Sequence, residues 1–155
     1  MGKELNLKIV LPSRTFLEEK VASVIIPAVR ADVNILPDRA PSVFALDFGV
    51  VRVLNPNGSI KADYFVHSGM AEVVDNDCNI MVQGAAVAAE LNVAEAKKRL
   101  EKAETPQMQL FYQMILDHQR NVRRRYLRTL QLYAKKLKQK NHFKKIISGS
   151  NSKKQ

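Results

Sequence analysis

The sequence predicts an all-β N-terminal sandwich of about ten short antiparallel strands, followed by a C-terminal antiparallel α-helical hairpin. Three observations lead to this prediction. Up to about residue 90, apolar and polar residues alternate in short runs that Pro, Gly and Asn separate. From residue 92, the apolar residues recur at the spacing of a helix. The charge changes at the same place: residues 1–91 hold eight Lys and Arg against eleven Asp and Glu, whereas residues 92–155 hold seventeen against four.

Residues 1–90 are predicted to form the sandwich domain. In residues 5–11, Leu and Ile alternate with Asn and Lys, which is the period of a half-buried strand. The Asn-Pro-Asn-Gly stretch at 55–58 predicts a turn, because Asn and Gly tolerate positive φ and Pro fixes its own φ, so residues 50–67 are expected to form a hairpin. Further strands are expected in the apolar runs 20–26, 42–54, 70–74 and 79–83.

Residues 91–147 are predicted to form a basic helical hairpin. Asn92 and Glu95 have the spacing of a capping box, in which the Asn side chain takes the role of Ser or Thr. Apolar residues then follow at helical spacing, so the first helix is expected over residues 93–104.

Thr105 and Pro106 end this helix and start the next, because Thr is a favourable N-cap and Pro at the first helical position loses no needed donor. The second helix is expected over residues 106–145, and a polar, disordered tail over 148–155. The apolar stripe of the second helix is longer than the first helix can cover, so part of it must meet another surface. The stripe consists of Met108, Phe111, Ile115, Val122, Tyr126, Leu130, Tyr133 and Leu137.

The residue types that form catalytic and cofactor sites do not occur at the spacing of such sites in this sequence. The three histidines are scattered without Cys partners at ligand spacing, and the six glycines lie in turns rather than in a phosphate-binding loop. His67 and Ser68 have the residue types of a base and a nucleophile. Adjacent residues of a strand face opposite ways, however, so we expect no hydrogen bond between them. We therefore predict that the chain is not an enzyme and binds no metal and no cofactor.

The chain also has the features of a protein from a reducing compartment. Cys78 is its only cysteine, so no internal disulfide can form. The first residues lack the apolar segment of a secretory signal, and no apolar run approaches the length of a membrane span. These features favour a cytoplasmic protein.

Two stretches within the pattern resemble a known family. Residues 34–41, Asn-Ile-Leu-Pro-Asp-Arg-Ala-Pro, are similar to the family stretch Gly-Ile-Leu-Pro-Gly-His-Ala-Pro. Residues 65–73, Phe-Val-His-Ser-Gly-Met-Ala-Glu-Val, are similar to a strand, Ser-Gly-Gly and second strand that ends in Glu-Val. Together with the opening strand and the helical hairpin, they make residues 4–140 resemble the epsilon subunit of the bacterial F-type ATP synthase, which is called delta in mitochondria.

The resemblance implies a non-catalytic rotor subunit in the central stalk of a proton-translocating enzyme. Such a subunit lies at the cytoplasmic face of the bacterial inner membrane and associates with the membrane only through the complex. Its partners are the gamma subunit, the c-ring and an acidic region of the beta and alpha subunits. By matching positions, the loop from Asp32 to Arg39 is the expected contact for gamma and the c-ring, with Asp32, Asp38 and Arg39 as candidate residues. The alternative is that Pro37 and Pro41 only shape a turn.

The resemblance also implies a brake on ATP hydrolysis. In the family, the hairpin can fold against the sandwich or extend along gamma, where its basic second helix reaches acidic residues of the beta subunits. The candidate residues for this contact are Arg120, Arg123, Arg124, Arg125 and Arg128. The alternative is a solvated cationic face that only keeps the helix soluble.

The head of the first helix departs from the family members that bind ATP. Those members carry Ile/Leu-Asp-x-x-Arg-Ala, whereas this chain has Asn92 in place of the Asp and Glu95 in place of the Arg. A Glu places negative charge where a phosphate would need a donor. We therefore predict weak or no ATP binding to the chain by itself.

A different class of function remains open for the basic helix. A cationic helix that also carries Phe111, Tyr112, Tyr126 and Tyr133 can follow the phosphates of a nucleic acid, so a nucleic-acid-binding accessory protein is the alternative. These aromatic residues fall mostly on the apolar stripe, which fits packing better than base stacking. A helix on anionic lipid is a further alternative, although its stripe has no Trp.

Overall fold

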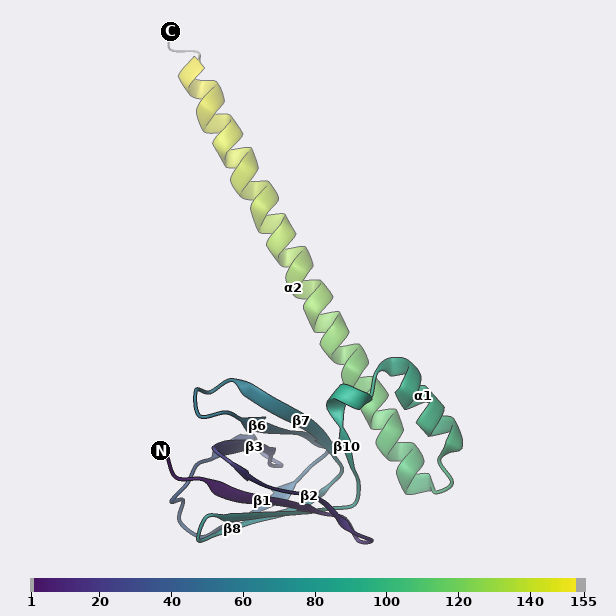
Figure 1. Ribbon diagram of the computed structural model, residues 1–155. Coiled ribbons are helices and arrows are strands. Elements are labelled where there is room, and N and C mark those ends of the chain that lie inside the picture. The colour runs from purple at the N-terminus through teal and green to yellow at the C-terminus, as the bar shows by residue number, and fades with distance from the viewer. Residues whose placement is uncertain (1, 153–155) are drawn as a thin grey trace. The chain divides into compact units, whose positions relative to one another are not determined.

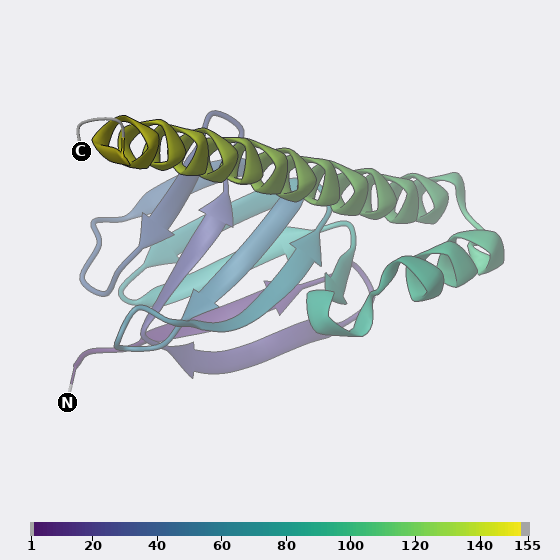
Figure 2. The same cartoon turned by 90° about the horizontal axis from the view of Figure 1, so that it is seen from above.

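The computed structural model describes residues 2–152, which form a β-sandwich followed by two helices (Figure 1, Figure 2). Ten strands make two five-stranded sheets, with the orders β2-β1-β9-β8-β5 and β10-β7-β6-β3-β4. This architecture confirms the predicted fold class. The strands are β1 (Leu5–Val10), β2 (Thr15–Val21), β3 (Ser23–Pro27), β4 (Asp32–Ile35), β5 (Ser42–Leu46), β6 (Gly49–Leu54), β7 (Ile60–Val66), β8 (Gly69–Val74), β9 (Asp77–Val82) and β10 (Ala85–Val87).

The core lies between the two sheets and follows from the alternation along the strands. In β1, Leu5, Leu7 and Ile9 are fully buried, and the residues between them face outward or are half-buried. Val51 and Val53 of β6 are buried in the same way from the opposite sheet. Burial of each such side chain stabilises the fold by about 1.5–3 kcal/mol, so the apolar face of each strand determines which side turns inward.

Two features of the sheets differ from the predicted pattern. β1 and β9 run parallel, with Leu7 opposite Cys78, whereas the other neighbouring strands in the described part of the chain are antiparallel. The run predicted at 42–54, which Gly49 interrupts, is divided between β5 and β6, and these two strands belong to different sheets. A parallel pair joins segments that are far apart in sequence, so local periodicity does not reveal it. Burial in this sheet raises the pKa of the Cys78 thiol to about 11, which keeps it unreactive at neutral pH.

The chain crosses between the sheets at His67 and Ser68, which connect β7 to β8. Gly69 follows, where the backbone of β8 lies against β9. A Cβ atom at Gly69 would lie 1.9 Å from the carbonyl oxygen of Met81, so this position accepts only glycine.

The helical hairpin begins and turns as its capping residues predict. α1 (Val93–Lys102) follows a short 3-10 turn, η1 (Ala88–Glu90), and the Oδ1 of Asn92 accepts the backbone N–H of Glu95 at 2.8 Å. α2 (Pro106–Ser152) starts after Thr105, whose Oγ1 accepts the backbone N–H of Met108 at 3.2 Å. Each oxygen satisfies a donor that the first turn of a helix leaves unpaired.

A second apolar cluster joins the helices to the sandwich. Phe111, Ile115 and Leu116 of α2 and Ala96 of α1 are buried against Phe65 of β7. The first turns of α2 therefore belong to the folded body, and they run alongside α1 (Figure 1).

The chain divides into two compact units, residues 1–116 and 117–155. The first unit thus extends well beyond the predicted domain boundary at residue 90, because the second cluster includes α1 and the start of α2. The second unit by itself is a single helix in which every residue from 120 to 149 is exposed. α2 continues to Ser152, so residues 148–152 are helical where a disordered tail was expected, and residues 153–155 lie outside the described part.

Candidate interaction surfaces

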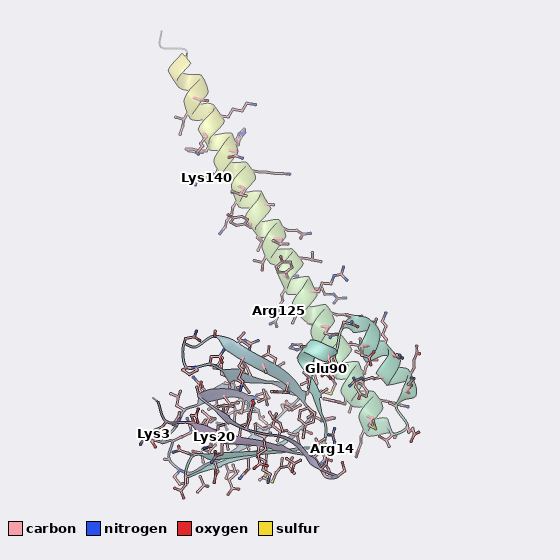
Figure 3. The ribbon with its side chains drawn as sticks, viewed as in Figure 1. Lys3, Arg14, Lys20, Glu90, Arg125 and Lys140 are labelled. Atoms are coloured by element: carbon pink, nitrogen blue, oxygen red, sulfur yellow. The ribbon has the colours of Figure 1, made fainter. Side chains whose placement is uncertain are left out.

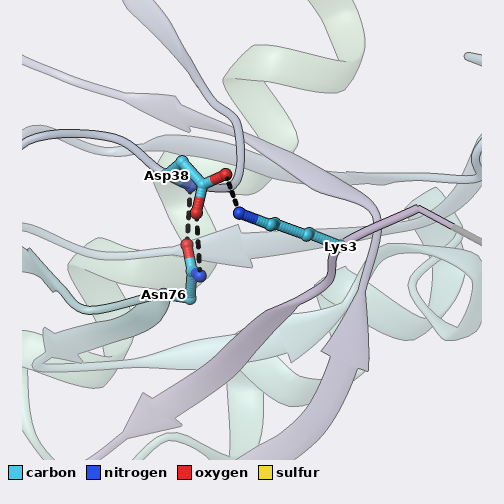
Figure 4. A network of polar contacts seen from close by, with 3 residues as sticks. All are labelled: Lys3, Asp38 and Asn76. Atoms are coloured by element: carbon cyan, nitrogen blue, oxygen red, sulfur yellow. Dashed lines mark hydrogen bonds and ion pairs between the residues drawn. The ribbon is translucent and has the colours of Figure 1, made fainter.

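Two other segments of the chain, which contain Lys3 and Asn76, contact the turn after β4 at Asp38 (Figure 4). Asp38 has a positive φ of 64°, and its backbone N–H donates to the Oδ1 of Asn76 at 2.7 Å. The Nζ of Lys3 lies 2.7 Å from the Oδ2 of Asp38. The hydrogen bond from Lys3, followed by that from Asn76, lowers the pKa of the Asp38 carboxyl group below its usual value. Asp38 is therefore engaged within the sandwich rather than free for a partner.

The other two candidate residues of this loop lie apart from Asp38. The guanidinium of Arg39 lies over the ring of Phe44, 5.2 Å from its centroid, so Arg39 is held against β5. Asp32 is exposed at the start of β4, where its charge contributes to raising the pKa of Arg52 after the larger effect of Asp63. Asp38, Arg39 and Asp32 thus follow one another along the edge of the sandwich and form no single polar site.

An apolar groove of about 490 Å³ runs between the edge strands β4 and β5 of the two sheets. Val29 and Val43 are 60% and 64% exposed on its walls, although both are large and apolar. Arg39 lies beside the groove, over Phe44. The lining residues are Ala28, Val29, Arg30, Ala31, Val33, Val43, Phe44 and Ala45. An exposed apolar groove with arginines at its rim is typical of a protein-binding surface.

The second candidate surface is the helix of the second unit. Residues 117–152 hold eleven Lys and Arg side chains and one Asp. At 100° per residue, Arg120, Arg124 and Arg128 share one row along the helix, whereas Arg123 and Arg125 lie on either side of it. The five arginines therefore cover a broad arc rather than one narrow face. Figure 3 labels Arg125 and Lys140 along this segment.

Apolar side chains occupy the opposite side of the same helix. Val122, Tyr126, Leu130, Tyr133 and Leu137 continue the stripe that begins with the buried Phe111 and Ile115, yet each is at least 45% exposed. The helix thus presents an apolar stripe opposite a cationic arc. Such a segment is suited to a partner that is apolar at its centre and acidic around it.

Asn92 and Glu95, which differ from the ATP-binding members of the family, both form hydrogen bonds within the start of α1. The Oδ1 of Asn92 caps the helix, and the Oε1 of Glu95 accepts a hydrogen bond from the Nε of Arg99 at 3.0 Å. These contacts are compatible with weak or no ATP binding at this place, which stays a prediction.

The expectation for His67 and Ser68 was wrong in its geometry. The Nδ1 of His67 lies 3.1 Å from the Oγ of Ser68 and also accepts the backbone N–H of Ser68 at 2.7 Å. Both residues lie outside the strands, so the alternation of a strand does not apply to them. The ring of His67 also stacks on the ring of Phe111, with 5.8 Å between the two centroids.

Within residues 2–152, no group of three His, Cys, Asp or Glu side chains is placed to hold a metal ion. Likewise, no helix in the described part of the chain is both long enough and apolar enough to cross a membrane. Sequence reasoning missed Lys3, Asn76 and Phe44. The only local signal was Asp75-Asn76, a pair that tolerates positive φ in a two-residue turn and indeed has φ values of 50° and 64°.

The sandwich with its helical hairpin defines the class of this protein. The family model described as "ATP synthase, Delta/Epsilon chain, beta-sandwich domain" matches residues 4–88. The chain therefore belongs to the ATP synthase delta/epsilon chain family.

Individual relatives agree with this family. The ATP synthase epsilon chain of Rhizobium etli (strain CIAT 652) is 32% identical over 103 residues, which are 66% of this chain and 76% of the relative. That of Granulibacter bethesdensis is 35% identical over 101 residues, 65% of this chain and 74% of the relative. A chain in the cryo-EM structure of the Euglena gracilis mitochondrial ATP synthase shares the fold with a TM-score of 0.55 and 19% identity, over 73% of this chain and 75% of that chain.

Proposed function

We propose that the chain is a non-catalytic subunit of the central stalk of a proton-translocating F-type ATP synthase, in which it couples the gamma subunit to the c-ring. Its membership of the delta/epsilon family is the main support. It would be peripheral at the cytoplasmic face of the bacterial inner membrane and reach that membrane only through the complex. The observation that carries the proposal is a family sandwich that exposes an apolar groove at its edge.

The gamma subunit would bind the groove between β4 and β5. Val29 and Val43 are more than half exposed there, so a partner that covers them removes apolar surface from water at about 25 cal/mol per Å². Arg30 lines the groove and Arg39 lies beside it, so both can pair with acidic groups around the contact. The neighbouring turn from Ile35 to Arg39 would contact the polar loops of the c-ring.

Replacing Val43 by Asp tests the groove. We expect this variant to bind a purified complex of gamma and the c-ring about tenfold more weakly, because the carboxylate would lose its water under the partner and would compete with the partner's acidic groups for Arg30 and Arg39. Affinity is measured by calorimetry or surface plasmon resonance. Ile60→Asp is the matched control, because Ile60 is 53% exposed on β7 and does not line the groove. Equal affinities of the two variants would reject this surface.

The helix of the second unit would act as the brake on ATP hydrolysis. Its cationic arc and exposed apolar stripe would bind an acidic region of the beta and alpha subunits. Exposed ion pairs are each worth little in isolation, so the contact would depend on several cations acting together. The alternative of a nucleic-acid partner rests on the exposure of Tyr126 and Tyr133 on the same helix.

Replacing the five arginines Arg120, Arg123, Arg124, Arg125 and Arg128 by Gln tests the charge of the brake. Glutamine keeps the helix propensity and most of the side-chain volume. At about 0.2 kcal/mol for each exposed pair, the loss is about 1 kcal/mol, so ATP hydrolysis by the assembled complex should rise about fivefold. Unchanged hydrolysis, together with nucleic-acid binding that falls steeply with salt, would favour the alternative function.

A further inference from the structure

The turn from Pro37 to Pro41 has an unusual backbone conformation at Asp38, where a side chain from another turn forms a hydrogen bond. Asp38 has a φ of 64°, a conformation that costs energy for a residue with a side chain and persists where neighbours hold it. Its backbone N–H points at the Oδ1 of Asn76, at 2.7 Å, which is a well-formed hydrogen bond across 38 residues of sequence. The contact that holds the turn thus comes from the β8–β9 connection.

Asn76 is itself fixed to the sheet. Its backbone oxygen accepts the N–H of Asn6 at 2.8 Å, and the Nδ2 of Asn6 donates to the Oδ1 of Asp77 at 2.8 Å. β1 therefore holds the β8–β9 turn in place, and the side chain of Asn76 links that turn to the backbone of Asp38. The residue after Asp38 is Arg39, which lies over Phe44 beside the groove. Arg39 thus directly follows the residue whose backbone N–H donates to Asn76 of the β8–β9 turn.

Lys3 contributes less to this arrangement than Asn76. Its ion pair with Asp38 is short, but the side chains of Lys3 and Asp38 are 71% and 55% exposed, so water and salt screen the attraction. The bond from Asn76 acts on the backbone of the turn itself. It therefore constrains the path of the chain, whereas Lys3 acts only on the end of the Asp38 side chain (Figure 4).

We infer that Asn76 is a positioning residue, which holds the 37–41 turn so that Arg39 is presented beside the groove in the geometry that a partner binds. This inference rests on the proposed function, because that function supplies the partner. The effect of Asn76 on the turn does not depend on the partner. Asp38, one of the candidate contact residues, then serves the turn rather than the partner, and Arg39 is the residue that meets the partner.

The substitution Asn76→Gly removes the side chain and leaves a residue that adopts the φ of 64° without strain. Asn57→Gly is the matched control, because the Oδ1 of Asn57 accepts hydrogen bonds from Ser59 within the β6–β7 turn, whereas that of Asn76 accepts from Asp38. In the free chain, we expect the amide of Asp38 in the Asn76→Gly variant to exchange about two- to tenfold faster, the effect of one hydrogen bond. The control should leave the exchange of this amide unchanged.

A double-mutant cycle then separates positioning from a general structural role. Asn76→Gly should weaken binding to the gamma and c-ring complex about two- to tenfold in the unchanged background, and by less than twofold when Arg39 is already Ala. Equal effects in the two backgrounds, unchanged amide exchange, or faster exchange without loss of affinity would each overturn the inference. If the unchanged chain binds no such complex, the proposed function fails alone, and the exchange measurement still decides whether Asn76 holds the turn.

Discussion

Replacing Phe111 by Ala should detach the helical hairpin from the sandwich, with a loss of about 3–5 kcal/mol in the free energy that holds it there. Phe111 is only 5% exposed, and its ring packs on Phe48 and His67 at 6.2 and 5.8 Å between centroids. Gly84 lies on another side of the ring, where an added Cβ atom would be 3.4 Å from the Cδ1 of Phe111. Ile115 and Leu116 stay buried in the same cluster, so truncation of Phe111 leaves a cavity between packed side chains.

The effect should be local, because the two apolar clusters are separate. The cluster between the sheets contains none of the residues that surround Phe111. Amide exchange in α1 should therefore rise about a hundredfold or more, as about 3 kcal/mol implies, while exchange in β1 and β9 stays nearly unchanged.

Leu110→Ala provides the control for this experiment. Leu110 adjoins Phe111 on α2 but is 53% exposed, so its truncation leaves the cluster intact and keeps the helix propensity high. If both variants leave exchange in α1 unchanged, Phe111 does not hold the hairpin. If Phe111→Ala instead unfolds the sandwich together with the hairpin, the two clusters form one cooperative unit.

The same cluster shows how far sequence reasoning reaches. The stripe from Phe111 to Leu137 has one continuous helical period, and nothing in that period shows that burial stops at Leu116. Burial of Phe111, Ile115 and Leu116 depends on their packing with Phe65 and Ala96, which only the folded first unit brings together. The strands were easier to predict, because the alternation of apolar and polar residues within each strand already shows which face is buried.

Contacts between distant segments account for what the sequence did not reveal. Asp38 and Asn76 read separately as residues that tolerate positive φ, and both have it, but their hydrogen bond joins two turns that only the sheet order brings together. The parallel pairing of β1 with β9 has the same origin. Local chemistry thus identified the turns, whereas the partners of their side chains required the fold.

Removal of residues 117–155 should raise ATP hydrolysis by the assembled complex about eightyfold, if the basic helix is the brake. Thirteen Lys and Arg residues are removed with this segment. At about 0.2 kcal/mol for each pair, they contribute about 2.6 kcal/mol. Leu116 is the right place to stop, because Phe111, Ile115 and Leu116 remain and complete the second cluster. A truncation at residue 107 would remove these three buried side chains and confuse loss of the brake with loss of the fold.

The comparison of this truncation with the five-arginine variant separates charge from apolar contact. If charge alone makes the brake, a variant with all thirteen Lys and Arg of residues 117–155 replaced by Gln should match the truncation. If the exposed stripe around Tyr126 and Tyr133 contributes, the truncation should release more hydrolysis than this full neutralisation does. Hydrolysis is measured with and without a proton gradient, and binding of the shortened chain to gamma serves as the control. A shortened chain that still binds gamma and leaves hydrolysis unchanged in both conditions would rule out the brake, because the sandwich would then be in place without it.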